Sequence, residues 1–188
     1  MTEMAGKLSM SPTQPQGDDI HTEVLIVGGG PCGLMLANEL GRRGVRALLV
    51  EPKPGTAFNP QANATQARTM EHFRRHGFAD EIREQGLPSD HPTDIAYFTR
   101  FSQHELARLR LPTAGQAAAT IKRMSGSWSA AELPHRVSQK FVEATLMRHA
   151  RQWSDIDIRH GWQLRDFNDN GREVEASIAS VDSTGSRS

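Results

Sequence analysis

The chain contains very little cysteine and no excess of either charge. Its 188 residues include one cysteine, Cys32, which excludes an internal disulfide and suits a reducing compartment, so we expect a cytoplasmic protein. Lysine and arginine together number 22, as do aspartate and glutamate, and the formal net charge is +0. Because no global field draws such a chain to nucleic acid or to an anionic membrane surface, we expect neither as a partner.

Long apolar runs are also lacking. No stretch is long and apolar enough to cross a bilayer, and the first residues lack the apolar core of a signal peptide. The polar composition of residues 1–21 predicts a disordered tail, and that of residues 183–188 predicts a disordered end. We expect residues 22–182 to form a single domain, which is long enough to bury a core.

A metal centre is not predicted. His72 and His76 are four residues apart and could share a helix face. No third ligand is evident, however, and the two arginines between them would repel a cation. A solvated helix face accounts better for these histidines.

The chain does contain a glycine-rich turn behind a short apolar run. Residues 24–27 (Val-Leu-Ile-Val) lead into Gly28, Gly30 and Gly33, which fit the spacing G-x-G-x-x-G. An apolar run bounded by glycine predicts a buried parallel strand, and Pro31 suits the first position of a helix. In this motif the glycines allow a tight turn, the approach of a pyrophosphate and close packing of helix on strand. We therefore predict that Gly28, Gly30, Pro31 and Gly33 hold the pyrophosphate of a dinucleotide at the start of this helix.

An acidic residue follows at the distance that a ribose requires. The helix is expected to be capped by Gly44, and residues 47–50 predict a second strand that ends in Glu51. An acid about twenty residues beyond the glycines can accept a hydrogen bond from a ribose hydroxyl. Glu51 is thus the predicted ribose ligand, and the alternative is a structural turn with an exposed glutamate. Cys32 is disfavoured as a nucleophile because no partner base is evident near it.

The remainder of the chain alternates short strands with helices. We expect helices from about residue 65 and from Gln139, the latter capped by Ser138, and a loop at residues 115–119, which are small and weakly patterned. The predicted strands are residues 94–99 and 106–111 (an inserted hairpin), 156–159, and 162–168 and 173–181 (on either side of an Asp-Asn-Gly turn). The pattern predicts an α/β fold, a Rossmann-like domain with a parallel sheet, an inserted β hairpin and a C-terminal β meander.

Five pieces of the sequence are similar to one family. They are residues 24–33, 49–51, 59–63, 68–71 and 133–139, in that order. With them the chain resembles the N-terminal part of the FAD-dependent aromatic (phenol-type) hydroxylases, the single-component flavoprotein monooxygenases, over most of residues 22–182. The glycine motif is shared by many nucleotide enzymes, whereas the fourth and fifth pieces are much more specific.

The resemblance implies a bound FAD and a set of contacts to it. The three glycines would hold its pyrophosphate and Glu51 its adenosine ribose, while Arg68 would lie beside the flavin side and Gln139 near the ribityl and phosphate groups. Arginine offers several donors to anionic or carbonyl oxygens, and glutamine can bond a hydroxyl or phosphate without adding charge. From the residues alone, Arg68 could equally solvate its helix and Gln139 could cap its own.

The family's chemistry is implied in the same way. NADPH would reduce the flavin, and the reduced flavin would use oxygen to hydroxylate a phenolic small molecule. No catalytic residue is assigned, and the oligomeric state is left open.

Some of the family's pattern is not matched. The second motif, an Asp-Gly ahead of an Arg-Ser pair, would follow the last strand, where residues 182–188 have a similar composition but a different spacing. The third motif and most of the substrate domain find no counterpart, and Pro52 stands where the family often has arginine. We therefore expect a truncated hydroxylase. Two alternatives stay open: a non-catalytic nucleotide-binding module and, less favoured because no hydride-transfer residues are apparent, an NAD-dependent dehydrogenase.

Overall fold

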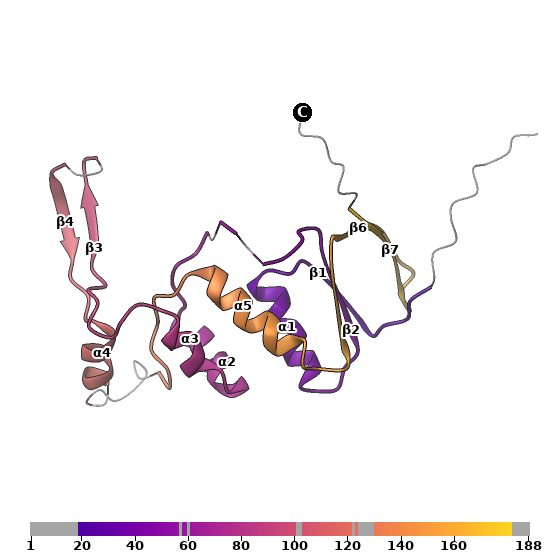
Figure 1. Ribbon diagram of the computed structural model, residues 1–188, viewed down its shortest axis with the longest axis horizontal. Coiled ribbons are helices and arrows are strands. Elements are labelled where there is room, and N and C mark those ends of the chain that lie inside the picture. The colour runs from indigo at the N-terminus through magenta and orange to yellow at the C-terminus, as the bar shows by residue number, and fades with distance from the viewer. Residues whose placement is uncertain are drawn as a thin grey trace, which may run out of the picture.

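A parallel three-stranded sheet lies at the centre of the fold (Figure 1). The computed structural model describes residues 19–56, 58–59, 61–100, 103–121, 123 and 130–181. The predicted disordered segments lie outside this part of the chain, apart from residues 19–21, and so do residues 182–188 with their motif-like composition. The sheet has the order β1 (Val24–Val27), β2 (Ala47–Glu51), β5 (Ile156–His160).

The middle strand is buried on both faces, as its uninterrupted apolar run predicts. Leu49 belongs to the core beneath the helices, and Val50, which points to the opposite face, is equally inaccessible. Strand β1 is different, because within the described residues it pairs with β2 alone. Ile26 is buried but Val27 is 56% exposed, so the prediction of a buried first strand is wrong at the end of that strand. An edge position, which periodicity does not reveal, is the reason.

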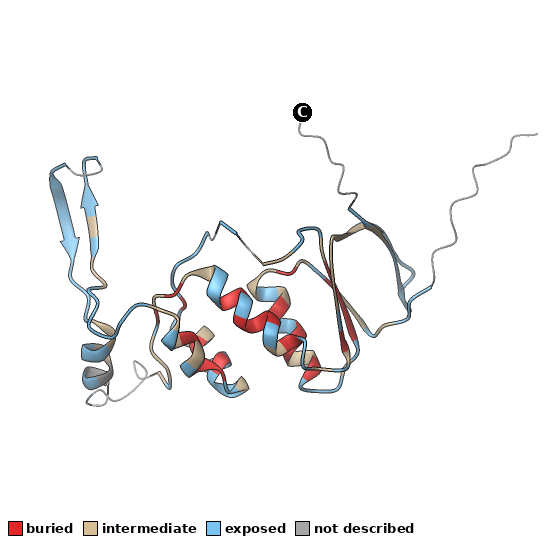
Figure 2. Cartoon of the chain, viewed as in Figure 1, coloured by how far each residue is buried: buried red, intermediate tan, exposed pale blue. Residues whose placement is uncertain are grey.

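Four helices supply most of the rest of the core. Helices α1 (Pro31–Gly41) and α5 (Gln139–Ala150) lie side by side on one face of the sheet, and α2 (Ala67–His76) and α3 (Ala79–Glu84) pack beside them (Figure 1). Figure 2 shows that the buried residues concentrate in these helices and in the central sheet. The largest side chains that are fully enclosed are Phe73, Phe78, Leu34, Leu49, Met70, Ile82 and Leu146.

A buried polar side chain joins α1 to α5. The Asn38 amide nitrogen donates to the carbonyl oxygens of Leu34 and Leu146, each at 2.9 Å, and so connects the two helices. Helix α1 ends at Gly41 with Arg42 as its C-cap, earlier than the predicted cap at Gly44, which instead takes a positive φ of 68° in the following turn.

Two antiparallel hairpins extend the fold at opposite ends (Figure 1). Strands β3 (Ile95–Phe98) and β4 (Glu105–Leu109) form the predicted inserted hairpin, which is largely exposed (Figure 2). Strands β6 (Trp162–Asp169) and β7 (Val174–Ser180) form the C-terminal antiparallel pair, on the side of the sheet away from the helices. The predicted α/β class, with its parallel sheet and inserted hairpin, is confirmed.

One predicted loop is a helix. Residues 115–119 lie within α4 (Ala114–Ile121), which follows the hairpin. Its start is a reciprocal cap, since the Gln116 N–H donates to Thr113 Oγ1 at 3.2 Å and the Thr113 N–H donates to Gln116 Oε1 at 3.1 Å. Small residues such as alanine favour a helix once such a cap is present. Among the described residues, no helix has the length and apolar character that a bilayer crossing requires.

Candidate functional site

The glycine turn joins β1 to α1 at the carboxyl edge of the parallel sheet. Gly28 has a φ of +108°, a conformation that favours glycine, and its N–H donates to the Val50 carbonyl at 2.9 Å. Gly33 approaches the turn so closely that a Cβ atom there would overlap the carbonyl oxygen of Gly28 and lie 3.3 Å from Ile26 Cγ2. The two glycines therefore provide the tight turn and the close helix packing that a dinucleotide-binding motif needs.

The start of α1 offers backbone donors to an open space. Gly30 is the N-cap, in extended backbone, and its carbonyl accepts a hydrogen bond from the Leu34 N–H at 3.0 Å. Pro31 takes the first helical position and no acidic side chain lies in the first turn. First-turn N–H groups have no intrahelical acceptor, and the helix dipole adds positive potential there. A Cβ atom at Gly30 would meet nothing within 4 Å in the described part of the chain, so a phosphate can approach the backbone.

Glu51 lies beside this turn, at the end of β2. Its Oε2 accepts a hydrogen bond from the Gly29 N–H at 2.7 Å, and its Oε1 accepts one from the Lys53 N–H at 2.9 Å. The carboxylate thus fixes the conformation of the turn. Each carboxylate oxygen can accept a further bond, so this contact is compatible with a ribose hydroxyl as an additional donor.

Two segments that are far apart in sequence pair next to the start of α1. The N–H of Thr65 donates to the carbonyl of His135 at 2.9 Å, and the N–H of His135 donates back at 3.0 Å. The ladder continues where the Val137 N–H donates to the carbonyl of Asn63 at 3.1 Å. The third and the fifth of the family-like pieces, residues 59–63 and 133–139, are therefore neighbours in space.

The Gln139 side chain closes this ladder. Its Oε1 accepts from the backbone N–H groups of Gln61 and Ala62, at 3.2 Å and 3.1 Å, and its Nε2 donates to Glu143 Oε1 at 2.7 Å. Ser138 is the N-cap of α5 as predicted, although its side chain makes no capping hydrogen bond. Gln139, at the first position of the helix, secures the loop through its side chain.

A hollow of about 490 Å³ lies between α1, α2, α5 and the segment that leads into α2. Pro31 and Cys32 line it at the start of α1, and Gln139 lines it at the start of α5. The remaining lining is mostly apolar and includes Met35 and Phe73. A hollow with this lining, bordered by the backbone donors of a helix start, suits a ligand with an anionic part and a flat apolar part.

The titratable side chains near the paired segments make contacts that support the fold. His135 is buried, its Nε2 lies 3.1 Å from the Arg83 carbonyl, and burial together with the Arg83 charge lowers the pKa of this histidine. The Arg83 guanidinium is itself paired with Glu132 at 2.7 Å. A neutral His135 that supports the ladder is the role that these contacts indicate. In the described residues, no three His, Cys, Asp or Glu side chains gather as a metal site would require.

The sequence matches the family model described as FAD binding domain over residues 21–187. The chain belongs to this family.

Relatives of the chain are considerably longer than it is. FAD-dependent monooxygenase apdD of Emericella nidulans is 33% identical over 156 residues, which are 81% of this chain and 25% of that protein. Phenol 2-monooxygenase of a Pseudomonas species is 29% identical over 143 residues, which are 76% of this chain and 23% of that protein. The flavin-dependent monooxygenase PieE, solved with FAD and substrate, has a TM-score of 0.74 and 28% identity, over 88% of this chain and 28% of that one. The chain thus spans about a quarter of the length of these relatives.

In this FAD-binding domain the predicted site residues fall into three places. The first place is the glycine turn, which contains Gly28, Gly30, Gly33 and Glu51. The second is the hollow, which Gln139 lines at the start of α5. Pro31 belongs to the turn and also lines the hollow. Arg68 is not brought to either place. Its side chain is 82% exposed, pairs with Glu71 at 2.7 Å and does not contribute to the lining of the hollow.

Sequence reasoning missed the walls of the hollow. Met35 and Phe73 have the spacing of ordinary core residues, and Thr69 and His72 have that of a helix surface. Nothing in their local pattern distinguishes them, because the hollow arises only when α1, α2 and α5 are packed together. Glu143 was also missed, although it lies one helical turn after Gln139, a spacing that could have indicated the hydrogen bond between them.

Proposed function

We propose that this chain is the FAD-binding part of an NADPH- and oxygen-dependent aromatic ring hydroxylase that acts on phenolic substrates. The observation that carries the proposal is the open backbone cradle at Gly28 and Gly30, positioned at the start of α1 and next to the apolar hollow. A dinucleotide needs donors for its pyrophosphate and room for its planar ring, and the two features lie side by side.

The residues fit the cofactor as follows. First-turn N–H groups of α1, with Gly28, Gly30, Pro31 and Gly33, would hold the pyrophosphate of FAD. Glu51 would accept from the adenosine ribose while keeping its bond to the turn. Gln139, at the hollow, would meet the ribityl or phosphate oxygens.

Arg68 is the least supported member of the set. Its exposed guanidinium would have to leave Glu71 to meet the flavin side of the cofactor. Such a change of rotamer is open to an exposed, surface-paired arginine, since ion pairs of this kind contribute little to stability.

Bound FAD would supply the redox chemistry with NADPH and oxygen, and the chain's own residues would bind and orient it. The phenolic substrate class is suggested by the relative named phenol 2-monooxygenase. A cytoplasmic setting suits the exposed thiol of Cys32, which a reducing compartment would keep free.

The visible absorption spectrum of the purified chain, after incubation with FAD and gel filtration, tests the proposal. A flavin band that travels with the protein, together with a raised melting temperature, is expected. A colourless protein whose melting is unaffected by FAD would contradict it. Stronger protection by NAD than by FAD would instead favour a dehydrogenase-like nucleotide site.

A flavin-loaded chain can then be tested for catalysis. Oxygen-dependent consumption of NADPH on addition of a phenol would support a hydroxylase, whereas FAD binding without such turnover would point to the non-catalytic nucleotide-binding alternative.

A further inference from the structure

The amide of Gln139 can adopt only one orientation in this structure. Its oxygen faces two backbone N–H groups, of Gln61 and Ala62, and these can only donate. Its nitrogen faces the Glu143 carboxylate at 2.7 Å, and an ionised carboxylate can only accept. Rotation of the amide by half a turn would place donor against donor and acceptor against acceptor at all three contacts.

Glu143 is unusual in its position. It lies one helical turn after Gln139 on α5, and it is only 3% exposed. A buried carboxylate is unfavourable unless hydrogen bonds compensate for its lost hydration, and the Gln139 amide supplies one such bond. The bond to Glu143 therefore has a consequence for the orientation of the Gln139 amide.

The fixed orientation of the Gln139 amide determines which of its groups is available to a ligand. Its oxygen is occupied by two donors and one of its N–H groups by Glu143, so the remaining amide N–H is the group offered at the hollow that Gln139 lines. A ligand therefore meets a hydrogen-bond donor here, which matches phosphate and ribityl oxygens and disfavours a ligand that needs an acceptor.

We propose that Glu143 is a positioning residue for the cofactor site, which fixes the Gln139 amide so that it donates to an acceptor on FAD and at the same time holds residues 61 and 62 in place. The ligand part of this inference rests on the proposed function. The part that concerns the loop does not, because the hydrogen bonds from Gln61 and Ala62 are independent of any ligand.

Glu143→Gln is the first variant to make. The new amide can accept from Gln139 or donate to it, so the orientation of Gln139 is no longer enforced at that contact. Glu84→Gln, on the exposed end of α3, is the matched control with the same chemical change away from the hollow. Glu143→Asp, which keeps the charge on a shorter side chain, is the second variant if Glu143→Gln fails to fold, and partial rescue is expected from it.

Two measurements decide the matter. Amide hydrogen exchange without any ligand is expected to become about threefold to tenfold faster at Gln61 and Ala62 in Glu143→Gln, and to stay unchanged in the control. Titration is expected to show FAD affinity about threefold to tenfold weaker, with ADP affinity within about twofold, because the glycine turn that would hold ADP is separate.

A double-mutant cycle separates positioning from general destabilisation. In a Gln139→Ala background, Glu143→Gln is expected to have no further effect on FAD affinity, because its action passes through Gln139. Unchanged exchange at Gln61 and Ala62, or effects that multiply in the double variant, would overturn the inference. If the unmodified chain binds neither FAD nor ADP, the proposed function and the ligand part fail together, while the exchange result still decides whether Glu143 holds the loop.

Discussion

Replacement of Gly33 by alanine tests the packing on which the whole nucleotide site depends. The added methyl group would overlap the carbonyl oxygen of Gly28 and lie 3.2 Å from its carbonyl carbon. Both are backbone atoms of the turn, and a third neighbour, Ile26 Cγ2 at 3.3 Å, belongs to the core. No flexible side chain can move aside, so helix α1 has to shift away from β1.

The size of the effect follows from this geometry. Carbon atoms in contact prefer separations of about 3.5–4.0 Å, so removal of the overlap requires a displacement of α1 on the order of 1 Å. Overpacking of this kind destabilises a protein by about 1–3 kcal/mol, and helix α1, which packs against both the sheet and α5, transmits the shift widely. For a chain of this size, that loss lowers the melting temperature by roughly 2–12 °C.

Gly30→Ala is the matched control for this experiment. It makes the same chemical change three residues earlier, where a Cβ atom meets nothing within 4 Å in the described part of the chain. Its backbone conformation is open to alanine, and the gain in unfolded-state entropy and the weaker N-cap offset each other to within about 1 kcal/mol. Thermal melting and urea denaturation of both variants, with FAD titration, complete the assay.

The two variants are expected to differ in which property they lose. Gly33→Ala loses stability and FAD binding together, whereas Gly30→Ala keeps its melting temperature and loses about tenfold or more in FAD affinity, since the methyl group occupies the approach of the pyrophosphate. A melting temperature of Gly33→Ala equal to that of the unmodified chain, or normal FAD affinity of Gly30→Ala, would refute this prediction.

Two further substitutions test the packing of α1, α2, α3 and α5, which form the helical layer. Glu81 of α3 accepts from Thr145 Oγ1 at 2.9 Å, forms an ion pair with Arg148 of α5, and has its Oε2 3.1 Å from Nε2 of His149, whose pKa is lowered by burial and by the Arg148 charge. Glu81→Gln should therefore lower the free energy of unfolding by about 1 kcal/mol in low-salt urea titrations, with a smaller difference in high salt; equal loss at both salt concentrations would argue against a charge effect. Burial lowers the pKa of His76 to about 4, and the Arg42 charge is the next largest cause. As the pH falls, His76 is therefore protonated in the unfolded chain before it is protonated in the folded chain. The free energy of unfolding should therefore fall between about pH 6.5 and pH 4, by up to about 3 kcal/mol more in the unmodified chain than in His76→Phe. The same dependence of the free energy of unfolding on pH in both proteins would contradict this.

The parts of the fold that could be predicted are those that depend on neighbours in sequence. The strand, glycine turn and helix from residue 24 to residue 41 follow from an apolar run, a glycine spacing and a proline at the first helical position. The turn of the C-terminal hairpin is equally local, since the Gly171 N–H donates to Asp169 Oδ1 at 2.8 Å. In each case the residues that determine the structure lie within a few positions of one another.

The predictions from sequence failed where the structure depends on a contact between distant segments, or where a local signal was overlooked. The exposure of Val27 depends on which strands pair with β1, and a single sequence does not show this. The helix α4 could have been found, because Thr113 and Gln116 have the spacing of a reciprocal cap. The small residues that follow obscured it, since they lack the apolar periodicity on which the prediction relied.

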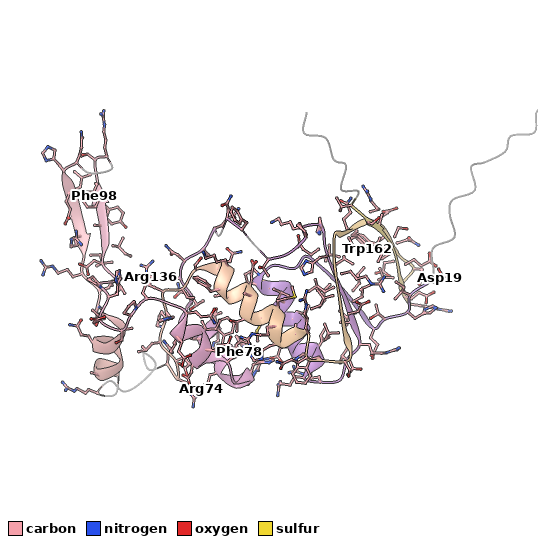
Figure 3. The ribbon with its side chains drawn as sticks, in the orientation of Figure 1. Asp19, Arg74, Phe78, Phe98, Arg136 and Trp162 are labelled. Carbon is pink, nitrogen blue, oxygen red and sulfur yellow. The ribbon has the colours of Figure 1, made fainter. Side chains whose placement is uncertain are left out.

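Phe78 illustrates how distant contacts assemble the helical layer. It is the N-cap of α3 and is buried (labelled in Figure 3). Its ring stacks on His149 of α5 with centroids 4.7 Å apart. By this contact and by Glu81, the layer of α2 and α3 is set against α5, and that arrangement forms two of the walls of the hollow. The shape of the hollow therefore depends also on side chains, such as Phe78 and Glu81, that do not line it.

The two parts of the candidate site consequently differ in how they are maintained. The glycine turn is fixed by contacts such as Gly33 against Gly28, which lie within one strand–helix unit and close at small entropic cost. The Gln139 side depends on segments that are 77 and 78 residues apart along the chain, joined by the backbone ladder and by the Gln139 side-chain amide, whose bonds to Gln61 and Ala62 are exposed. Exposed hydrogen bonds between distant segments open at a lower free energy than contacts buried within one strand–helix unit, so the second part is the one expected to fluctuate first. A dinucleotide that contacts both parts would stabilise the Gln139 side more than the turn, and binding and local folding would be coupled there.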